Sequence, residues 1–196
     1  MTARWFDEWT PEQRAAYASR FLDLAAAGHD IDGEARLVDA LAGRGSRILD
    51  AGCGTGRVAA ALAARGHHVL GVDLDPSLVD AGRRQYAGLP LRELDLLSLS
   101  PAIGTFDLIV SAGNVMVYLS PGTERAVLAA MASVLAPGGR AVFGFATDRP
   151  YTVSDLDADA AAAGWSREGR FATWQLDPFL PGSDWAVSIY RGPDVG

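Results

Sequence analysis

The sequence of 196 residues has one cysteine, three histidines and no long apolar run. With Cys53 alone an internal disulfide is impossible, and nothing indicates an oxidising compartment. No apolar stretch reaches the ~18 residues of a membrane span, and the opening MTARWFDEW lacks the apolar core of a secretory signal. We therefore expect a cytoplasmic protein that does not associate with membranes.

Positive charge is also scarce. Lysine and arginine total 17 against 24 aspartates and glutamates, which gives a net charge of −7 and an isoelectric point near 4.9. Such a field repels phosphate backbones, so we expect no nucleic-acid partner. The hydrophobic content of 49% is that of a globular chain. At this length we expect one domain, residues 1–196, as a monomer or a homodimer.

What the sequence does contain is an alternation of strands and helices. After two expected helices near residues 10–27 and 32–41, strands are predicted at 47–51, 68–73, 91–94, 106–112 and 141–146, with helices at 57–64, 76–86 and 122–135 between them. The strands are apolar almost throughout, which is typical of a parallel sheet covered on both faces. The expected class is doubly wound α/β.

The last quarter of the chain departs from this alternation. An alanine-rich helix is predicted at 153–163, and two strands at 165–174 and 185–191 follow with no helix between them. Without a crossover the second strand can only pair antiparallel to the first. The sheet should therefore end in an antiparallel hairpin.

The most informative stretch is ILDAGCGTGRVAAAL, in which a strand breaks into the alternate glycines Gly52, Gly54 and Gly56 and becomes a helix. Such a turn lets the backbone approach a ligand and points free N–H groups at it. Asp73 closes the next strand, so it should lie beside the turn, where a carboxylate can accept both hydroxyls of a ribose. An adenosine-type ligand is expected.

Two classes of ligand compete for this turn. GTGRVA satisfies the loose dinucleotide pattern, with Asp73 at a suitable distance, which favours an NAD(P)-dependent oxidoreductase. Asp50, however, lies at the mouth of the turn, where it would repel a pyrophosphate and attract a ligand with an ammonium and a sulfonium. The chain also leaves no room for the separate substrate domain that most nicotinamide enzymes carry.

Four blocks in order, ILDAGCGTG, VLGVDLDPSLVDAGRR, FDLIVSAGNVMVYL and LAPGGRAVFGF, resemble the class I S-adenosylmethionine-dependent methyltransferases. The match covers roughly Arg47 to Ala146. It implies a Rossmann-like core at 46–196 with seven strands, the last antiparallel, and S-adenosylmethionine as cofactor. Residues 1–45 would form an N-terminal helical lid. The implied activity is methyl transfer to an unidentified small molecule with release of S-adenosylhomocysteine. A non-catalytic module that binds S-adenosylmethionine is a further alternative.

The resemblance also implies cofactor-binding positions. The turn would supply Asp50, Ala51, Gly52, Cys53, Gly54 and Gly56, with Asp50 near the methionine ammonium. Asp73 would hold the ribose and Leu74 would pack on the adenine. Asp95, followed by Leu96, would bind the adenine amino group, and Ala112 and Gly113 would contact the methionine part.

Other candidates follow from their place in the predicted sheet. Tyr17 and Arg20 lie one turn apart on a helix, and Arg20 either meets the cofactor carboxylate or is a solvated arginine beside a core tyrosine. Asn114 and Tyr118 follow the fourth strand, so they either contact the substrate as catalytic residues or serve as a turn cap and core filler. His67 and His68 stand at the start of the second predicted strand, at the edge of the sheet opposite its ligand-binding end, so neither is a candidate general base. No metal site is expected.

Overall fold

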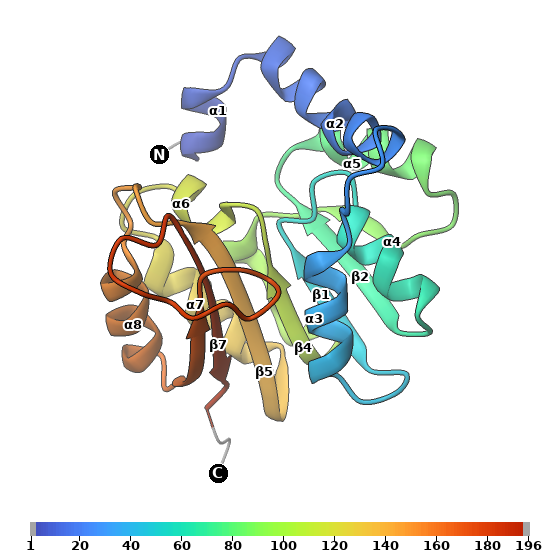
Figure 1. Cartoon of the computed structure of the whole chain (residues 1–196). Helices are drawn as coiled ribbons and strands as arrows, with labels where there is room; N and C mark the ends of the chain where they lie inside the picture. Colours follow the sequence, from blue (N-terminus) through green and yellow to red (C-terminus); the bar gives the residue numbers. More distant parts are fainter. Residues whose placement is uncertain (1–2, 194–196) are drawn as a thin grey trace.

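A seven-stranded sheet forms the centre of the computed structural model, which describes residues 3–193 (Figure 1). Its strand order is β3-β2-β1-β4-β5-β7-β6. The strands are β1 (Arg47–Ala51), β2 (His68–Asp73), β3 (Leu91–Glu93), β4 (Phe106–Ser111), β5 (Leu135–Ala146), β6 (Ser166–Phe171) and β7 (Trp185–Arg191). Pairing is parallel from β3 to β5, and β7 runs antiparallel to both β5 and β6. The mostly parallel sheet and its antiparallel hairpin are confirmed.

Helices cover both faces of this sheet. One face carries α3 (Gly33–Leu41), α4 (Arg57–Ala64) and α5 (Pro76–Gln85). The other carries α6 (Val115–Tyr118), α7 (Glu124–Ser133), α8 (Val153–Ala162) and two 3₁₀ turns, η1 (Leu96–Ser98) and η2 (Pro101–Ile103). None of the helices described within residues 3–193 combines the length and apolar character needed to cross a bilayer.

The two faces explain why the parallel strands are apolar throughout. Neighbouring residues of a strand point to opposite faces. In β1, Ile48 therefore packs in the cluster that contains α3, α4 and α5, whereas Leu49 packs in the cluster of α6, α7 and α8. Both side chains are fully buried. The uninterrupted apolar strands thus fill two cores at once.

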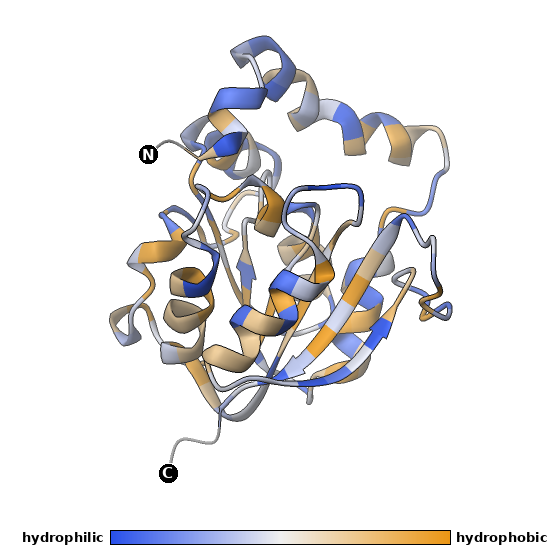
Figure 2. Cartoon of the chain, turned by 90° about the vertical axis from the view of Figure 1, so that its left-hand side faces the viewer, coloured by the Kyte–Doolittle hydropathy of each residue, from blue (hydrophilic) through white to orange (hydrophobic). Residues whose placement is uncertain are grey.

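The first two helices, α1 (Arg4–Glu8) and α2 (Pro11–Ala26), lie above the sheet edge at which the parallel strands end (Figure 1). Thr10 and Gln13 form a capping box that starts α2. Neither helix has a buried residue, and Figure 2 shows hydrophilic and hydrophobic residues mixed along them. We call residues 4–26 the N-terminal arm. In contrast, α3 buries Ala35 and Val38 and belongs to the packed layers.

The fifth strand begins earlier than the sequence pattern indicates. The strand was expected at 141–146, but β5 starts at Leu135 and passes through Pro137 to Gly139. Its pairing with β4 shifts register between Phe106 and Leu108, which marks a bulge. Gly138 takes a left-handed conformation (φ 72°), so the strand bends there without ending. The short helices α1 and α6 were not predicted either.

Candidate functional site

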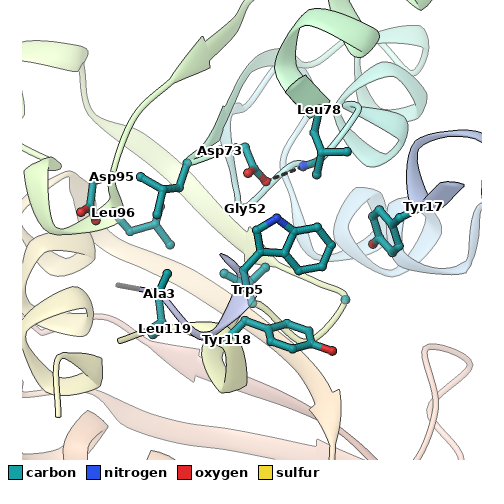
Figure 3. A pocket seen from close by; sticks show the side chains of 14 residues that line it. Ala3, Trp5, Tyr17, Gly52, Asp73, Leu78, Asp95, Leu96, Tyr118 and Leu119 are labelled. Atoms are coloured by element: carbon teal, nitrogen blue, oxygen red, sulfur yellow. Dashed lines mark hydrogen bonds between the residues drawn. The ribbon is translucent and has the colours of Figure 1, made fainter. Parts of the chain in front are cut away.

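A cavity of about 650 Å³, including the part open to solvent, lies where the carboxyl ends of β1, β2 and β4 meet (Figure 3). The predicted cofactor residues that line it are Tyr17, Gly52, Gly54, Asp73, Leu74, Asp95, Leu96 and Gly113. The sheet therefore brings together residues that are far apart in the sequence.

The glycine turn forms the floor of this cavity. Gly52 and Cys53 both donate their backbone N–H to the carbonyl of Val72, at 2.8 and 2.9 Å, which fixes the turn against β2. Gly52 is left-handed (φ 82°), and a Cβ at this position would collide with Val115. Only glycine therefore satisfies both the backbone angle and the close approach of α6.

Asp73 lies beside the turn, as the order of the strands predicts. Its Oδ2 accepts the N–H of Gly54 at 2.8 Å (Figure 3). Its Oδ1 accepts the N–H of Asp75 at 2.9 Å. Burial raises the pKa of Asp73 to about 6, although these backbone hydrogen bonds act in the opposite direction. The carboxylate is thus held in one orientation at the cavity wall.

Asp50 is more deeply buried than Asp73, with an exposed fraction of 2%. Its Oδ2 accepts the N–H of Ala59 at 3.0 Å, inside the first turn of α4. Burial raises the pKa of Asp50 to about 7, and the Ala59 hydrogen bond and the charge of Arg57 limit the rise. Asp50 lines an adjoining hollow together with the predicted residues Cys53 and Ala112. Tyr17 and Gly113 line both spaces.

The far end of the cavity is more apolar. Leu74 is 37% exposed although it is a large hydrophobic residue, and Leu78 and Leu96 line the same space. Asp95 accepts the N–H of Leu97 at 2.9 Å and so caps η1 at the cavity rim. A flat apolar group with a polar edge suits such a surface.

The N-terminal arm closes the cavity with aromatic rings. The indole of Trp5 lines the cavity, with Tyr118 below and Asp73 above in the view of Figure 3. Its ring centroid is 4.9 Å from Trp9, 5.4 Å from Tyr17 and 5.5 Å from Tyr118. Trp9 Nε1 also donates to the Tyr118 hydroxyl at 3.1 Å.

Some predicted residues lie elsewhere. Arg20 lines a shallow hollow along α2. It does not line either of the two spaces at the glycine turn. Ala51 is fully buried in the core, and Gly56 caps α4 behind the turn.

The two catalytic candidates differ in where their side chains lie. Asn114 Oδ1 accepts the N–H of Ala146 at 2.8 Å, so its side chain joins the ends of β4 and β5, whereas Tyr118 lines the cavity. Within residues 3–193, no group of three or more His, Cys, Asp or Glu side chains is arranged to hold a metal ion.

The cation whose charge acts on the buried Asp50 was not predicted from the sequence. Arg57 opens α4 directly after Gly56 and lines the same hollow as Asp50. It forms an ion pair with Glu34 at 2.5 Å, and its guanidinium lies 4.2 Å from the ring centroid of Phe21. Its position in GTGR was the only available signal.

Comparison with known proteins identifies the family. A family model described as "Methyltransferase domain" matches residues 48–139. The crystal structure of a TehB-like S-adenosylmethionine-dependent methyltransferase from Corynebacterium glutamicum superposes with a TM-score of 0.88 at 43% identity, covering 93% of this chain and all of that one. The chain belongs to the S-adenosylmethionine-dependent methyltransferase family.

Curated methyltransferases are also similar. A magnesium-protoporphyrin O-methyltransferase from Rhodobacter capsulatus is 36% identical over 96 residues, which are 46% of this chain and 41% of that protein. A demethylmenaquinone methyltransferase from Symbiobacterium thermophilum is 32% identical over 153 residues, 73% of this chain and 54% of its own length. This methyltransferase chain thus spans about half the length of the curated relatives it matches.

The residues at the cavity fit the cofactor of a methyltransferase of this family, S-adenosylmethionine. The glycine turn leaves backbone and no side chain at the cavity floor, Asp73 presents an oriented carboxylate, and Leu74 exposes an apolar surface. A cationic ligand also relieves the charges that burial makes costly at Asp50 and Asp73.

Proposed function

We propose that the chain transfers the methyl group of S-adenosylmethionine to a small-molecule acceptor and releases S-adenosylhomocysteine. The observation that carries the proposal is the oriented carboxylate of Asp73, which lies against the glycine turn at the wall of the cavity. The relatives give no support to an oxidoreductase or to a non-catalytic module.

We assign the binding roles from the cavity outward. Asp73 accepts the ribose hydroxyls, Leu74 and Leu96 hold the adenine between them, and Asp95 accepts from its amino group. Gly52, Gly54 and Gly113 leave space for the methionine part. Asp50 supplies negative charge below the ammonium, through the adjoining hollow. Bound there, the cofactor supplies a methyl group that its positively charged sulfur activates.

The chain's own part in the transfer is to align the acceptor and exclude water. We propose that the aromatic cover formed by Trp5, Trp9 and Tyr118 shields the reacting edge, and that Tyr118 contacts the acceptor. Asn114 acts as a positioning residue, because its amide fixes the β4 and β5 ends relative to each other. The arm at 4–26, which supplies Trp5 and Trp9 to this cover, is a shorter segment than the lid of residues 1–45 that the resemblance implies.

Two observations support a small-molecule acceptor. The two similar curated proteins are named for small molecules, magnesium-protoporphyrin and demethylmenaquinone. The net charge of −7 disfavours nucleic acid.

Isothermal titration calorimetry with S-adenosylhomocysteine and with NADH tests the cofactor assignment. We expect binding of the first and none of the second, and the reverse would overturn the proposal.

Incubation with methyl-labelled S-adenosylmethionine and a cell extract then tests the acceptor. Label should enter the low-molecular-mass fraction, whereas label confined to protein or nucleic acid would exclude a small-molecule acceptor.

A further inference from the structure

One buried carboxylate outside the assigned binding residues joins the N-terminal arm to the cavity. Asp75 is 1% exposed. It accepts from Trp5 Nε1 of α1 at 2.9 Å and pairs with Arg14 Nε of α2 at 3.1 Å. It also caps α5, accepting from the backbone N–H of Ser77 at 2.9 Å. Three elements therefore meet at one side chain.

The backbone of the same residue contacts the site. The N–H of Asp75 donates to Asp73 Oδ1 at 2.9 Å, which is one of the two hydrogen bonds that orient the Asp73 carboxylate. A displacement of Asp75 would therefore change the geometry of the wall assigned to the ribose. The arm and the cavity share this residue.

The arm makes few other polar contacts with the rest of the described chain. It contains no buried residue, so apolar packing contributes less to it than to the other helices. Its remaining polar contacts with the cavity rim include Arg4 Nη1 to the carbonyl of Val117 at 3.1 Å and Trp9 Nε1 to Tyr118 at 3.1 Å. In the part of the chain that the structure describes, Arg14 with Asp75 is the only ion pair between the arm and the rest of the molecule.

The state of charge at Asp75 suits this role. Burial acts to raise its pKa, but hydrogen bonds from Ser77 and Trp5 and the charge of Arg14 more than compensate, so the pKa lies below its usual value. With the arm displaced, Asp75 would lose both of its partners from α1 and α2 and keep the cap of α5. The ionised side chain therefore favours the closed arm.

We propose that Asp75 is a positioning residue that couples closure of the arm to retention of the cofactor, an inference that rests on the proposed function. It holds the Trp5 indole over the cavity while its backbone fixes Asp73. Release of S-adenosylhomocysteine then requires the contacts of Asp75 with Trp5 and Arg14 to break.

Three variants separate this role from simple helix capping. Asp75→Ser keeps a good cap for α5 but removes the carboxylate that the arm needs. Trp5→Phe keeps the ring and removes the donor, and Arg14→Gln removes the charge. Asp107→Ser is the matched control, because it deletes a carboxylate that accepts the N–H of Arg47 at the start of β1, at the opposite edge of the sheet.

Two measurements on the full chain provide the test, and neither needs the acceptor. The first is the affinity and dissociation rate of S-adenosylhomocysteine, and the second is hydrogen exchange of residues 4–26 with and without it. In the wild type we expect the ligand to slow exchange in the arm. Asp75→Ser should weaken binding about tenfold, as expected for losing hydrogen bonds to a charged group, and should abolish the slowing. Trp5→Phe and Arg14→Gln should act in the same direction with smaller effects, and Asp107→Ser should have none.

The outcomes distinguish this inference from the proposed function. If the wild type does not bind S-adenosylhomocysteine, the proposed function fails. If it binds, and Asp75→Ser matches the wild type in arm exchange and dissociation rate, the coupling role is overturned while the function stands. Should exchange also rise within α5, the double variant Trp5→Phe/Arg14→Gln decides, because it leaves the α5 cap intact. A wild-type dissociation rate in that variant would equally overturn the inference.

Discussion

Two carboxylates flank the glycine turn, Asp50 buried and Asp73 partly buried, and each is held by backbone donors rather than by a cation. Asp73 accepts from Gly54 and Asp75, and Asp50 accepts from Ala59. Backbone N–H groups fix the direction of a carboxylate without neutralising its charge. The site therefore keeps negative charge available for a cationic ligand.

The first residue-scale prediction concerns Asp73. Asp73→Ala should weaken S-adenosylhomocysteine binding tenfold or more, because hydrogen bonds to a charged acceptor contribute ~1.5–3 kcal/mol. Calorimetry measures the change. Asp80→Ala is the control, since Asp80 is an exposed carboxylate on α5 that pairs with Arg83. Unchanged affinity in Asp73→Ala would show that the ribose lies elsewhere.

The second residue-scale prediction concerns the pH dependence of ligand affinity. Burial raises the pKa of Asp73 to about 6 and of Asp50 to about 7, so both lose protons as the pH rises through this range. The affinity for S-adenosylhomocysteine, whose ammonium favours the ionised carboxylates, should increase between pH 5.5 and 8. Calorimetry across this range should also show a flatter profile for Asp50→Asn. An affinity independent of pH in the wild type would contradict the assignment.

The same shifts have the opposite effect on the ligand-free protein. A carboxyl group whose folded pKa is raised binds protons more tightly in the folded state, so its contribution to stability is full at low pH. This contribution to stability is lost as the pH rises through about 6 for Asp73 and through about 7 for Asp50. Ligand binding and folding stability thus change in opposite directions with pH at this site.

At the residue scale, the sequence predicted the positions that strand order determines. Asp73 ends a strand adjacent to the glycine turn, so the sheet alone places it. Arg20 and Asn114 were harder, because the direction of a side chain on a half-packed helix or in a left-handed turn depends on tertiary contacts. Arg57 and Asp75 were missed for the same reason. Their partners, Glu34, Trp5 and Arg14, come from distant segments.

At the scale of elements, the contrast between α2 and α8 is informative. Both begin with a threonine capping box, Thr10 in α2 and Thr152 in α8. Helix α8 buries Leu156 and Ala160, whereas α2 has no buried residue. The same local motif therefore serves a core helix and an arm.

This contrast gives a prediction. Thr152→Ala should lower the free energy of unfolding by ~1 kcal/mol, the usual contribution of an N-cap, because α8 unfolds with the core. Thr10→Ala should leave the global value within about 0.5 kcal/mol and speed hydrogen exchange only in residues 4–26. Urea denaturation and exchange measure the two effects. Equal losses of global stability would show that the arm belongs to the cooperative core.

The strands and long helices were predictable because their periodicity is strong and their ends carry glycine, proline or capping residues. The short helices α1 and α6 were not, since about one turn of helix has too few residues to display a period. The extension of β5 through Pro137 to Gly139 depends on a bulge against β4, which only the paired strand reveals.

At the scale of the whole molecule, two apolar clusters on opposite faces of one sheet support a site at its edge. The antiparallel hairpin followed from the missing crossover, but the insertion of β7 between β5 and β6 is a property of the assembled sheet. Because β7 pairs with β5 over its full length, the C-terminal segment stabilises the strand whose end Asn114 holds.

Ligand binding should stabilise this whole unit. S-adenosylhomocysteine at one hundred times its dissociation constant adds ~2.7 kcal/mol to the free energy of unfolding. For a chain of this size that corresponds to a rise in Tm of about 5–11 °C. Differential scanning calorimetry gives the measurement, with NADH at equal concentration as the control. A rise with NADH and none with S-adenosylhomocysteine would contradict the family's cofactor at this site.

The absence of buried residues in the arm has an evolutionary consequence. Substitutions in residues 4–26 change the cover over the proposed site while leaving both apolar clusters intact. Most mutations that abolish folding do so by disrupting a core. A library randomised within the arm should therefore retain a high fraction of folded members, and new acceptor preferences can be selected there with the scaffold unchanged.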